Sequence, residues 1–403
     1  MTQDSIKLIL GRKAIHPFPA RMAPPIIAEC LRGLPAGSRI LDPMMGSGTV
    51  LAIARACGHS AVGVDIDPLA VLNSRVWLTT LDEDLTRVRA RDVLRRASSR
   101  LKKTPARDAY PKGADAETRK FIRYWFDVSS RRQLAALAHS IGGVRDDVVR
   151  EALWCGFSRL IISKQAGASR AMDLSHSRPH RTYSHAPIQP MERYLEMVEH
   201  VVKNCITTRE RKKGPRAVAM KGDARVLKLS DESFDLILTS PPYLNAIDYM
   251  RCSKFSLVWM GYTTGDVREL RRTSIGAEVG TPPSERTTEA IAGLKLEGAI
   301  PERFNAILST YISDMVLTMN ESRRVVRPKG KVVYVVGEST VRGTFIPTAK
   351  IVQAAAHDAG LKLVERRSRE LPNNRRYMPP PSLATGRMTS RMRSEVVLTF
   401  QHR

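Results

Sequence analysis

The feature that most constrains the fold is an ordered run of strand, glycine-containing turn, helix and second strand near the N-terminus. Its segments are Ser38–Asp42, Pro43–Thr49, Val50 to about Cys57, and Ala61–Asp65. Gly58 supplies a stop for the helix, and an acid ends each strand. This order predicts the opening of a doubly wound α/β sheet.

Further strands and helices continue the pattern on both sides of a long gap. Asp67 is a typical N-cap with Pro68 at the first helical position, which predicts a helix directly after the second strand. Apolar runs predict strands at Ala217–Met220, Phe234–Thr239, Lys331–Gly337, Leu361–Glu365 and Glu395–Phe400. Helices are expected at Pro25 to about Leu31, Pro190 to about Cys205, Pro301 to about Val326 and Ile346–Ala359, with a turn at 327–330.

The gap, residues 80–215, is predicted to be helical and is strongly basic. From Arg87 to Arg132 the chain carries 15 Lys or Arg against 5 Asp or Glu. A basic, mainly helical insertion is therefore expected to interrupt the sheet. Residues 245–300 are polar and irregular in pattern, and Asp248–Arg251 within them is either the start of a helix or part of a binding pocket.

The net charge of the chain limits the classes of partner that it can bind. Lys and Arg number 65 against 40 Asp and Glu, which gives a net charge of +25. Such an excess attracts a polyanion, and nucleic acid is the first candidate. An acidic membrane surface is a weaker alternative, because no apolar run approaches about 18 residues and no long basic amphipathic helix is evident. Solvated charge without a ligand is the third possibility.

Cysteine usage and the N-terminus indicate a cytoplasmic protein without a metal. The five cysteines are far apart and form no Cys-x-x-Cys pair, as expected of reduced thiols. The chain does not begin with the apolar region of a signal peptide. His176, His180 and His185 share one basic loop, but their spacing matches no familiar zinc site. We therefore expect no metal there and favour contact with phosphates or substrate.

Ser240-Pro241-Pro242-Tyr243 follows the apolar strand at 234–239, where open α/β sheets place their chemistry. The prolines lack N–H donors, so local carbonyls stay free as acceptors, and Ser240 adds a hydroxyl acceptor. Together with the flat ring of Tyr243, they suit a planar base that carries an exocyclic amino group. The amino group would donate to Ser240 and the Pro241 carbonyl while the base stacks on Tyr243. A simple proline turn is the structural alternative.

The glycine turn predicts the class of cofactor. Gly46 and Gly48 allow a sharp turn and the close approach of a ligand, and the next helix points its N-terminus there. Asp65, 19 residues after Gly46, can bind both hydroxyls of a ribose. A dinucleotide would want a third glycine, which this turn lacks. S-adenosylmethionine fits better, with its ribose at Asp65, its cationic amino acid near Asp42 and its adenine near Asp223.

At these motifs the chain resembles the DNA amino-methyltransferases, which modify cytosine at N4 or adenine at N6. Asp42–Thr49 is similar to the cofactor loop of this family, Gly63–Asp67 to its acidic ribose motif, and Thr239–Tyr243 to its catalytic motif. His16–Met22 is similar to the N-terminal segment that closes over the methionine end of the cofactor, and Arg391–Phe400 resembles the last strand. The resemblance covers the sheet, somewhat over half the chain, and leaves 80–215 unmatched.

The resemblance implies a Rossmann-like methyltransferase sheet in three parts. These are a cofactor-binding half at 1–79, the basic insertion at 80–215, which is a candidate DNA-binding region, and a catalytic half at 216–403. A recognition loop is also possible at 245–300. The motifs and the resemblance together predict cofactor binding by Phe18, Pro19, Ala20, Asp42, Pro43, Gly46, Gly48, Thr49, Asp65, Ile66 and Asp223. The predicted catalytic residues are Ser240, Pro241, Pro242 and Tyr243.

The implied activity is methyl transfer from S-adenosylmethionine to the exocyclic amine of a base flipped out of duplex DNA. A serine at the head of the tetrapeptide is similar to the cytosine-N4 members, and adenine N6 is the alternative. Such enzymes often have a cognate restriction nuclease as partner. Two rivals remain: methylation of an exocyclic amine in RNA, such as guanine N2, and a non-catalytic nucleic-acid-binding protein.

Overall fold

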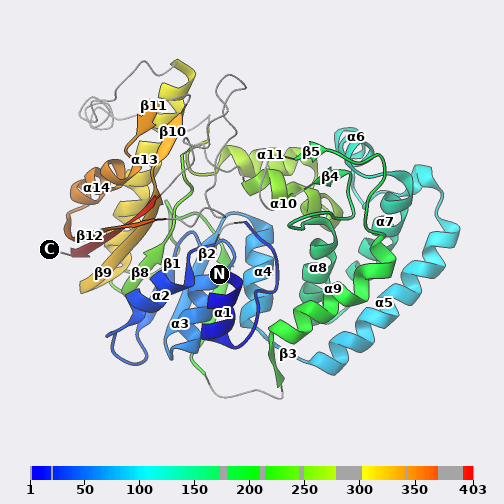
Figure 1. Cartoon of the computed structure of the whole chain (residues 1–403), viewed down its shortest axis with the longest axis horizontal. Coiled ribbons are helices and arrows are strands. Elements are labelled where there is room, and N and C mark those ends of the chain that lie inside the picture. Colours follow the sequence, from blue (N-terminus) through cyan, green and yellow to red (C-terminus); the bar gives the residue numbers. More distant parts are fainter. Residues whose placement is uncertain are drawn as a thin grey trace.

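The centre of the structure is a seven-stranded sheet in the order β12-β13-β9-β8-β1-β2-β7 (Figure 1). The computed structural model describes residues 2–19, 21–172, 174, 179–208, 214–244, 249–277, 302–341, 344–370 and 394–402. The strands are β1 (Arg39–Asp42), β2 (Ser60–Asp65), β7 (Ala217–Lys221), β8 (Phe234–Thr239), β9 (Val326–Gly337), β12 (Leu361–Glu370) and β13 (Ser394–His402). The predicted α/β sheet is confirmed.

The winding of the sheet reverses between β1 and β8. β1 pairs in parallel with β2 on one side and with β8 on the other, and the parallel pairing continues to β7 and β9. From β1 the chain runs outward through β2 to β7, then returns to β8 and continues to β9. The carboxyl ends of β1 and β8 therefore lie side by side at the point where such sheets bind ligands. β13 and β12 complete the sheet with antiparallel pairing.

Alternating side chains explain why helices cover both faces of the sheet. In β8, Leu236 and Leu238 enter one buried cluster and Ile237 enters another, while Ile40 and Leu41 of β1 divide in the same way. The first cluster includes residues of α1 (Thr2–Leu10), α2 (Pro24–Leu31), α3 (Thr49–Ala56) and α4 (Pro68–Leu78). The second includes residues of α13 (Glu302–Val325) and α14 (Thr348–Asp358).

The insertion is mainly helical, as predicted. Its helices are α5 (Glu83–Lys103), η1 (Ala106–Asp108), α6 (Ala116–Trp125), α7 (Val128–Gly142), α8 (Asp147–Ile161) and α9 (Pro190–Asn204). Four aspartates explain where α5 to α8 begin, because each caps its helix by accepting from a backbone N–H three residues on: Asp82, Asp115, Asp127 and Asp146. Short strands β4 (Ala171–Met172) and β5 (His180–Arg181) pair antiparallel. The ends of the insertion meet where β3 (Thr80–Leu81) pairs in parallel with β6 (Ile206–Thr207).

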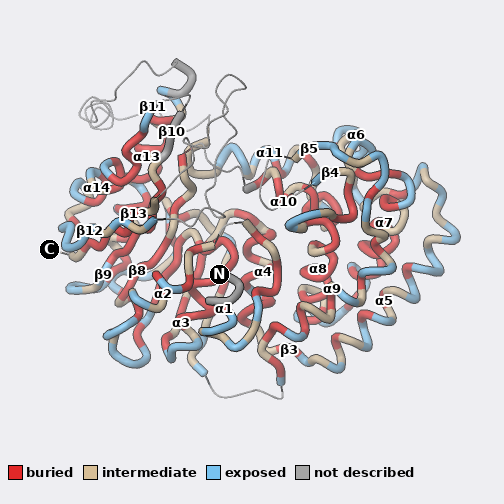
Figure 2. The backbone as a smooth tube through the Cα atoms, viewed as in Figure 1, coloured by how far each residue is buried: buried red, intermediate tan, exposed pale blue. Residues whose placement is uncertain are grey.

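One hydrophobic cluster runs from the sheet into the insertion. It contains Ile40 and Leu51 beside the cofactor turn and also Leu134, Leu153 and Val198 from α7, α8 and α9. Figure 2 shows buried residues in the central strands and in the helices of the insertion. The insertion is therefore packed onto the sheet rather than joined to it by a linker.

The described part of 245–300 is helical rather than irregular, and of the two alternatives for Asp248–Arg251 the helix start is confirmed. That part forms α10 (Tyr249–Leu257), η3 (Val258–Met260) and α11 (Thr264–Arg272). α11 begins at a capping box in which Thr263 and Asp266 satisfy each other's backbone N–H groups. This Thr-x-x-Asp signal is local, and the polar composition of the helix concealed it. Residues 278–300 of the predicted recognition loop lie outside the described residues.

Two further boundaries differ from the prediction. The turn expected at 327–330 is an irregularity inside β9, where Phe234 pairs with Val326 but Leu236 pairs with Lys331. Lys329 has φ 65°, so the chain bulges there without reversing its direction. The helix expected from Ile346 begins at Thr348, because Ile346 belongs to β11 (Thr344–Ile346), which pairs with β10 (Ser339–Val341).

Candidate active site

A hydrogen bond joins the two motifs at the point where the sheet reverses. Asp42 is the last residue of β1 and Thr239 is the last residue of β8, and both are buried. The Thr239 hydroxyl donates to Asp42 Oδ1 over 2.7 Å, and the Met44 N–H donates to the same oxygen over 3.2 Å. Ser240 follows Thr239 directly, so the predicted catalytic tetrapeptide begins beside the predicted cofactor turn.

Asp42 has no cation to balance its charge among the residues that the structure describes. Burial raises the pKa of this carboxyl to about 7, the hydrogen bonds from Thr239 and Met44 oppose the rise, and the nearby charge of Asp65 adds to it. A buried carboxylate in this state gains stability from any cationic group brought against it. Asp42 is therefore suited to a positively charged ligand.

Asp65 holds the glycine turn in place. Its carboxylate accepts from the Gly46 N–H over 2.8 Å and from the Asp67 N–H over 2.9 Å. Burial raises the pKa of Asp65, and hydrogen bonds from the backbone N–H groups of Asp67, Gly46 and Ile66 counter that rise. These contacts leave lone pairs of the carboxylate free for further donors such as hydroxyl groups.

Gly48 is required by both its backbone and its surroundings. It adopts φ +73° as the N-cap of α3, and a Cβ built on it would lie 2.6 Å from Ser74 Oγ. Ser74 also donates to the Gly46 carbonyl over 3.2 Å, which fixes the turn against α4. Pro43 and Thr49 at the ends of the turn are buried. The predicted cofactor residues of the first two strands are thus brought together.

Asp67 links the acidic motif to the helix that follows the catalytic motif. It caps α4 by accepting from the Leu69 N–H over 2.8 Å, and it also accepts from the hydroxyl of Ser253 on α10. Burial raises the pKa of Asp67 to about 7, and the charge of Asp65 raises it further. The sequence predicted the capping role but not Ser253, which lies 186 residues away.

The tetrapeptide is anchored to β13, the strand next to the edge strand β12. The Ser240 hydroxyl donates to the Tyr243 oxygen over 3.4 Å, and the Tyr243 hydroxyl donates to Glu395 Oε1 on β13 over 3.3 Å. Pro241 is buried, while Pro242 and Tyr243 are half-buried. Sequence reasoning missed Glu395, because nothing near Tyr243 in the chain signals a partner on a strand 152 residues later.

The N-terminal segment packs into the interior. Phe18 is buried in the hydrophobic cluster that also contains Ile15 and Met22, and Pro19 is half-buried. His16 is buried too, and its Nε2 lies 2.9 Å from the hydroxyl of Ser158 on α8. Burial, with the nearby charges of Arg159 and Arg21, lowers the pKa of His16 well below its ordinary value. Ala20 lies outside the described residues, and the cofactor role of this segment stays a prediction.

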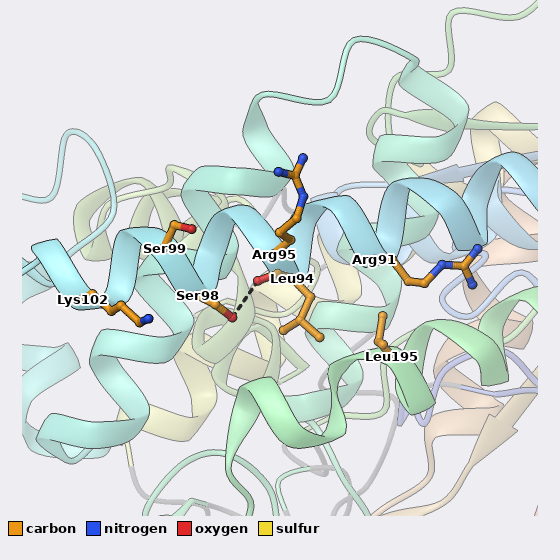
Figure 3. A pocket seen from close by; sticks show the side chains of 7 residues that line it. All are labelled: Arg91, Leu94, Arg95, Ser98, Ser99, Lys102 and Leu195. Atoms are coloured by element: carbon orange, nitrogen blue, oxygen red, sulfur yellow. Dashed lines mark hydrogen bonds between the residues drawn. The ribbon is translucent and has the colours of Figure 1, made fainter.

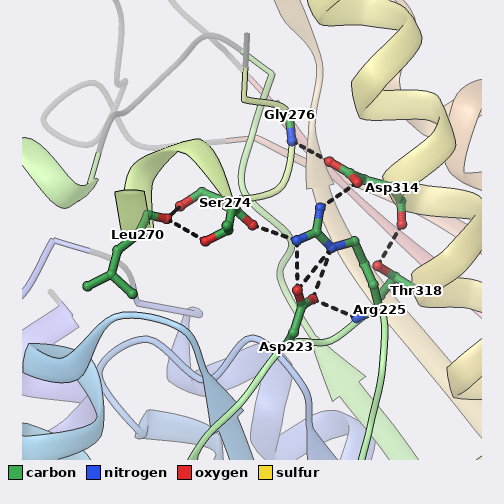
Figure 4. Close-up of polar contacts among 8 residues, drawn as sticks. Asp223, Arg225, Leu270, Ser274, Gly276, Asp314 and Thr318 are labelled. Carbon is green, nitrogen blue, oxygen red and sulfur yellow. Dashed lines mark hydrogen bonds and ion pairs between the residues drawn. The ribbon is translucent and has the colours of Figure 1, made fainter. Parts of the chain in front are cut away.

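Asp223, two residues after β7, is held by an arginine (Figure 4). Arg225 Nη2 and Nε donate to the two oxygens of Asp223 over 2.7 and 3.0 Å, and Arg225 Nη1 donates to Asp314 Oδ1 on α13 over 2.7 Å. Arg225 Nη2 also donates to the Thr273 carbonyl, and the Gly276 N–H donates to Asp314 Oδ2 over 2.8 Å. Burial raises the pKa of Asp223, but the hydrogen bonds and charge of Arg225 outweigh it, so the net shift is downward. A role for Asp223 toward adenine stays a prediction.

The histidine loop shows no metal site in the part that can be described. His180 and His185 are exposed, and His176 lies outside the described residues. Throughout the described chain, no group of three or more His, Cys, Asp or Glu side chains is placed to hold a metal ion. None of the described helices is both long and apolar enough to cross a membrane.

A surface hollow lies on the insertion (Figure 3). Its lining comes from α5 and one residue of α9: Arg91, Leu94, Arg95, Ser98, Ser99, Lys102 and Leu195. α5 occupies the side of the insertion away from the sheet (Figure 1). The hollow is therefore separate from the strand ends where the motifs meet.

Comparison with known proteins finds methyltransferases that are similar to this chain. No protein-family model matches the chain. The Type II methyltransferase M.MvaI of Kocuria varians is 22% identical over 419 residues, which cover 96% of this chain and 90% of that protein. The Type II methyltransferases M.BsoBI of Geobacillus stearothermophilus and M.MjaII of Methanocaldococcus jannaschii are 20% and 22% identical. Those matches cover 83% and 70% of this chain, and 75% and 67% of the two proteins. Over most of its length, the chain is therefore similar to Type II methyltransferases.

The similarity to these methyltransferases extends beyond the motifs. Because the match to M.MvaI covers 96% of the chain, it includes the insertion, which the motif resemblance left unmatched. Among solved structures, an S-adenosylmethionine-dependent methyltransferase from Methanosarcina mazei aligns with 94% of this chain and 97% of its own. Its identity is 11% and its TM-score is 0.34.

Proposed function

We propose that this protein transfers a methyl group from S-adenosylmethionine to the exocyclic amine of a base flipped out of duplex DNA. Cytosine N4 is the proposed target and adenine N6 is the alternative. The observation that carries the proposal is the hydrogen bond from Thr239 to Asp42, because it sets a motif suited to an amino group beside a motif suited to a cationic nucleoside. The named Type II methyltransferase relatives support the same activity.

The residues at the ends of β1 and β2 fit S-adenosylmethionine. Asp42 would face its positively charged end and Asp65 its ribose hydroxyls, while the Gly46–Gly48 turn brings the backbone close without a Cβ. Neither carboxylate forms an ion pair with any residue that the structure describes, and burial raises the pKa of both. When bound, the cofactor supplies the methyl group. Phe18, Pro19 and Ala20 are proposed to cover its methionine end.

The tetrapeptide is proposed to prepare the amine as a nucleophile. The lone pair of an exocyclic amine is delocalised into the ring, so the amine attacks poorly. The Ser240 hydroxyl and the Pro241 carbonyl would accept its hydrogens and turn the lone pair toward the methyl carbon. The base nitrogen then bonds to that carbon as the carbon–sulfur bond breaks, and the nitrogen releases a proton to solvent. The same acceptors stabilise the positive charge that develops on the nitrogen.

Tyr243 is proposed to receive the flipped base. Taking a base out of the duplex costs a few kcal/mol, and stacking on an aromatic ring returns about 1–3 kcal/mol. The contact between the Tyr243 hydroxyl and Glu395 restrains the ring before the base arrives. The net charge of +25 supplies attraction to the phosphates. A cognate nuclease and a cytoplasmic location remain part of the proposal.

The test is incubation with radiolabelled S-adenosylmethionine and either duplex DNA or total RNA, followed by nucleoside analysis. Label as N4-methylcytosine in DNA is the expected result, and N6-methyladenine would select the alternative target. Label in RNA alone would refute a DNA substrate. The control is Asp65→Ala, which removes the proposed ribose contact and should weaken cofactor binding in calorimetry. A wild-type protein that neither binds the cofactor nor transfers label would contradict the whole assignment.

A further inference from the structure

We propose that one basic surface of the insertion, the rim, holds the phosphate backbone of the DNA beside the catalytic loop. The rim consists of the exposed residues of α6 and the β4–β5 pair. Figure 1 shows these elements grouped along one edge of the insertion. The inference rests on the proposed function, because it identifies where the proposed substrate lies.

Aromatic packing fixes the rim to the helix that follows the catalytic tetrapeptide. Phe255 of α10 contacts Phe121 and Trp125 of α6 edge-on, with ring centroids 5.3 and 5.0 Å apart. α11 joins α6 through the Thr264 N–H, which donates to the Thr118 hydroxyl over 2.9 Å. The rim is therefore built onto the segment that leaves the catalytic motif, and DNA held there would lie within reach of Tyr243.

Backbone hydrogen bonds fix the β4–β5 pair to α6. The Arg170 N–H donates to the carbonyl of Trp125 over 2.8 Å, and the Thr182 N–H donates to the carbonyl of Arg170 over 2.9 Å. On the surface above these bonds, the guanidinium of Arg181 lies 5.0 Å from the ring centroid of Tyr124. Tyr124 is 50% exposed, so the stacked pair faces solvent. Stacking orients the guanidinium and leaves its N–H groups available to an anion.

The cations of the rim lack acidic partners. Arg119, Lys120, Arg123 and Arg181 are exposed, and none of them forms an ion pair with a carboxylate in the described part of the chain. The acidic residue of α6, Glu117, pairs instead with Arg268 of α11. Two of the rim cations are still held against the surface: the Arg119 guanidinium lies 5.3 Å from the Tyr110 ring, and Arg123 donates to the Tyr110 hydroxyl over 3.3 Å. Arginines that are held in position against aromatic rings but are not neutralised by a carboxylate suit phosphate oxygens.

A second positively charged patch lies on α5, away from the rim. Arg91 and Lys102 line the hollow of Figure 3 and, like the rim cations, form no described ion pair. Their helix packs on α7 and α9, on the side of the insertion away from the sheet (Figure 1). If DNA contacts the rim specifically, loss of rim charge should weaken DNA binding and loss of α5 charge should not. If the protein attracts DNA only through its overall positive charge, the two losses should have equal effects.

The experiment compares two double variants that each remove two positive charges: Lys120→Ala with Arg181→Ala at the rim, and Arg91→Ala with Lys102→Ala on α5. Duplex DNA binding is measured between 50 and 200 mM salt. Each lost phosphate contact lowers the slope of log affinity against log salt by about 0.9. Across this fourfold salt range, the rim variant should lose about 12-fold less affinity than the wild type, and the α5 variant should match the wild type.

Other readouts separate the possible failures. Single-turnover methylation at saturating DNA and cofactor affinity should be unchanged in the rim variant, because neither residue touches the reacting atoms. Arg181→Lys retains the charge and should keep the wild-type salt slope, which controls for folding. Equal effects from both double variants would overturn the proposal. Normal DNA binding by the rim variant would also overturn it, and would leave an acidic protein as the partner of the rim. A wild-type protein with no salt-dependent DNA binding and no methylation would instead refute the proposed function.

Discussion

Arg225→Ala tests most directly the ion-pair network that joins the loop after β7 to α13. The Arg225 side chain is 18% exposed, and the carboxylates it binds belong to Asp223, at 33%, and Asp314, at 3%. Breaking a buried pair by removing one partner costs about 3–5 kcal/mol, because a buried charge is left without compensation. Asp223 can turn toward solvent but Asp314 cannot, so the expected loss in the free energy of unfolding is about 3 kcal/mol.

Urea titrations at neutral pH measure that loss. Arg225→Lys should lose less, because an ammonium can reach one carboxylate but cannot bind both of them and the Thr273 carbonyl together. The matched control is Arg193→Ala. Arg193 pairs with Glu196, both side chains are about half exposed at 51% and 53%, and its loss should cost no more than about 0.5 kcal/mol.

The pH dependence provides the second half of the test. Arg225 lowers the pKa of Asp223 in the folded protein, so the contribution of this pair is present above the unfolded pKa of about 3.9 and is lost as the pH falls through the folded value. The difference between wild type and Arg225→Ala should therefore be largest near neutral pH and shrink as the pH falls and the carboxylates take up protons. A difference under about 1 kcal/mol, or one that persists in acid, would refute this reasoning.

Three further predictions concern the candidate active site. Gly48→Ala should lower stability by at least about 1 kcal/mol and weaken cofactor binding, because alanine is strained at φ +73° and its Cβ would meet Ser74; melting curves and calorimetry measure both effects. Burial raises the pKa of Asp42 to about 7, so the free energy of unfolding of the ligand-free protein should fall as pH rises from about 4 to 7. Asp42→Asn should reduce this slope without abolishing it, since the pKa of Asp67 is also raised to about 7, and a slope unchanged in urea titrations would show that Asp42 is not the cause. Tyr243→Ala should cut turnover while cofactor affinity in calorimetry stays the same, and lost cofactor affinity would place Tyr243 in the wrong subsite.

The sequence predicted those parts of the fold that local signals determine. Asp67 is the N-cap of α4 and Pro68 is its first residue, so two adjacent local signals made the start of this helix predictable from the chain alone. The order of the motifs likewise predicted the meeting of the glycine turn and the tetrapeptide, because parallel strands end at the same edge. In contrast, α11 was missed because its composition is polar, although the Thr263–Asp266 capping box that begins it can be read from the sequence.

Side-chain partners brought together by the sheet could not be predicted in the same way. Tyr243 and Glu395 meet only because β13 pairs with β9, and the register of that pairing has no local signal. Arg225 is different, since it stands two residues after Asp223 and the spacing alone could have suggested an ion pair. The prediction of a free Asp223 overlooked a nearby competitor for its oxygens.

The hydrophobic cluster shared by the sheet and the insertion has a consequence for folding. Residues from β1 and α3 pack in the same cluster as residues from α7, α8 and α9, so removing the insertion would expose apolar surface on the sheet half as well. The two parts should therefore unfold in a single cooperative transition rather than as independent domains. If the whole insertion were exchanged between relatives, the sheet half would then need compensating changes. Substitutions on the exposed faces of the insertion could change specificity with less disruption of the core.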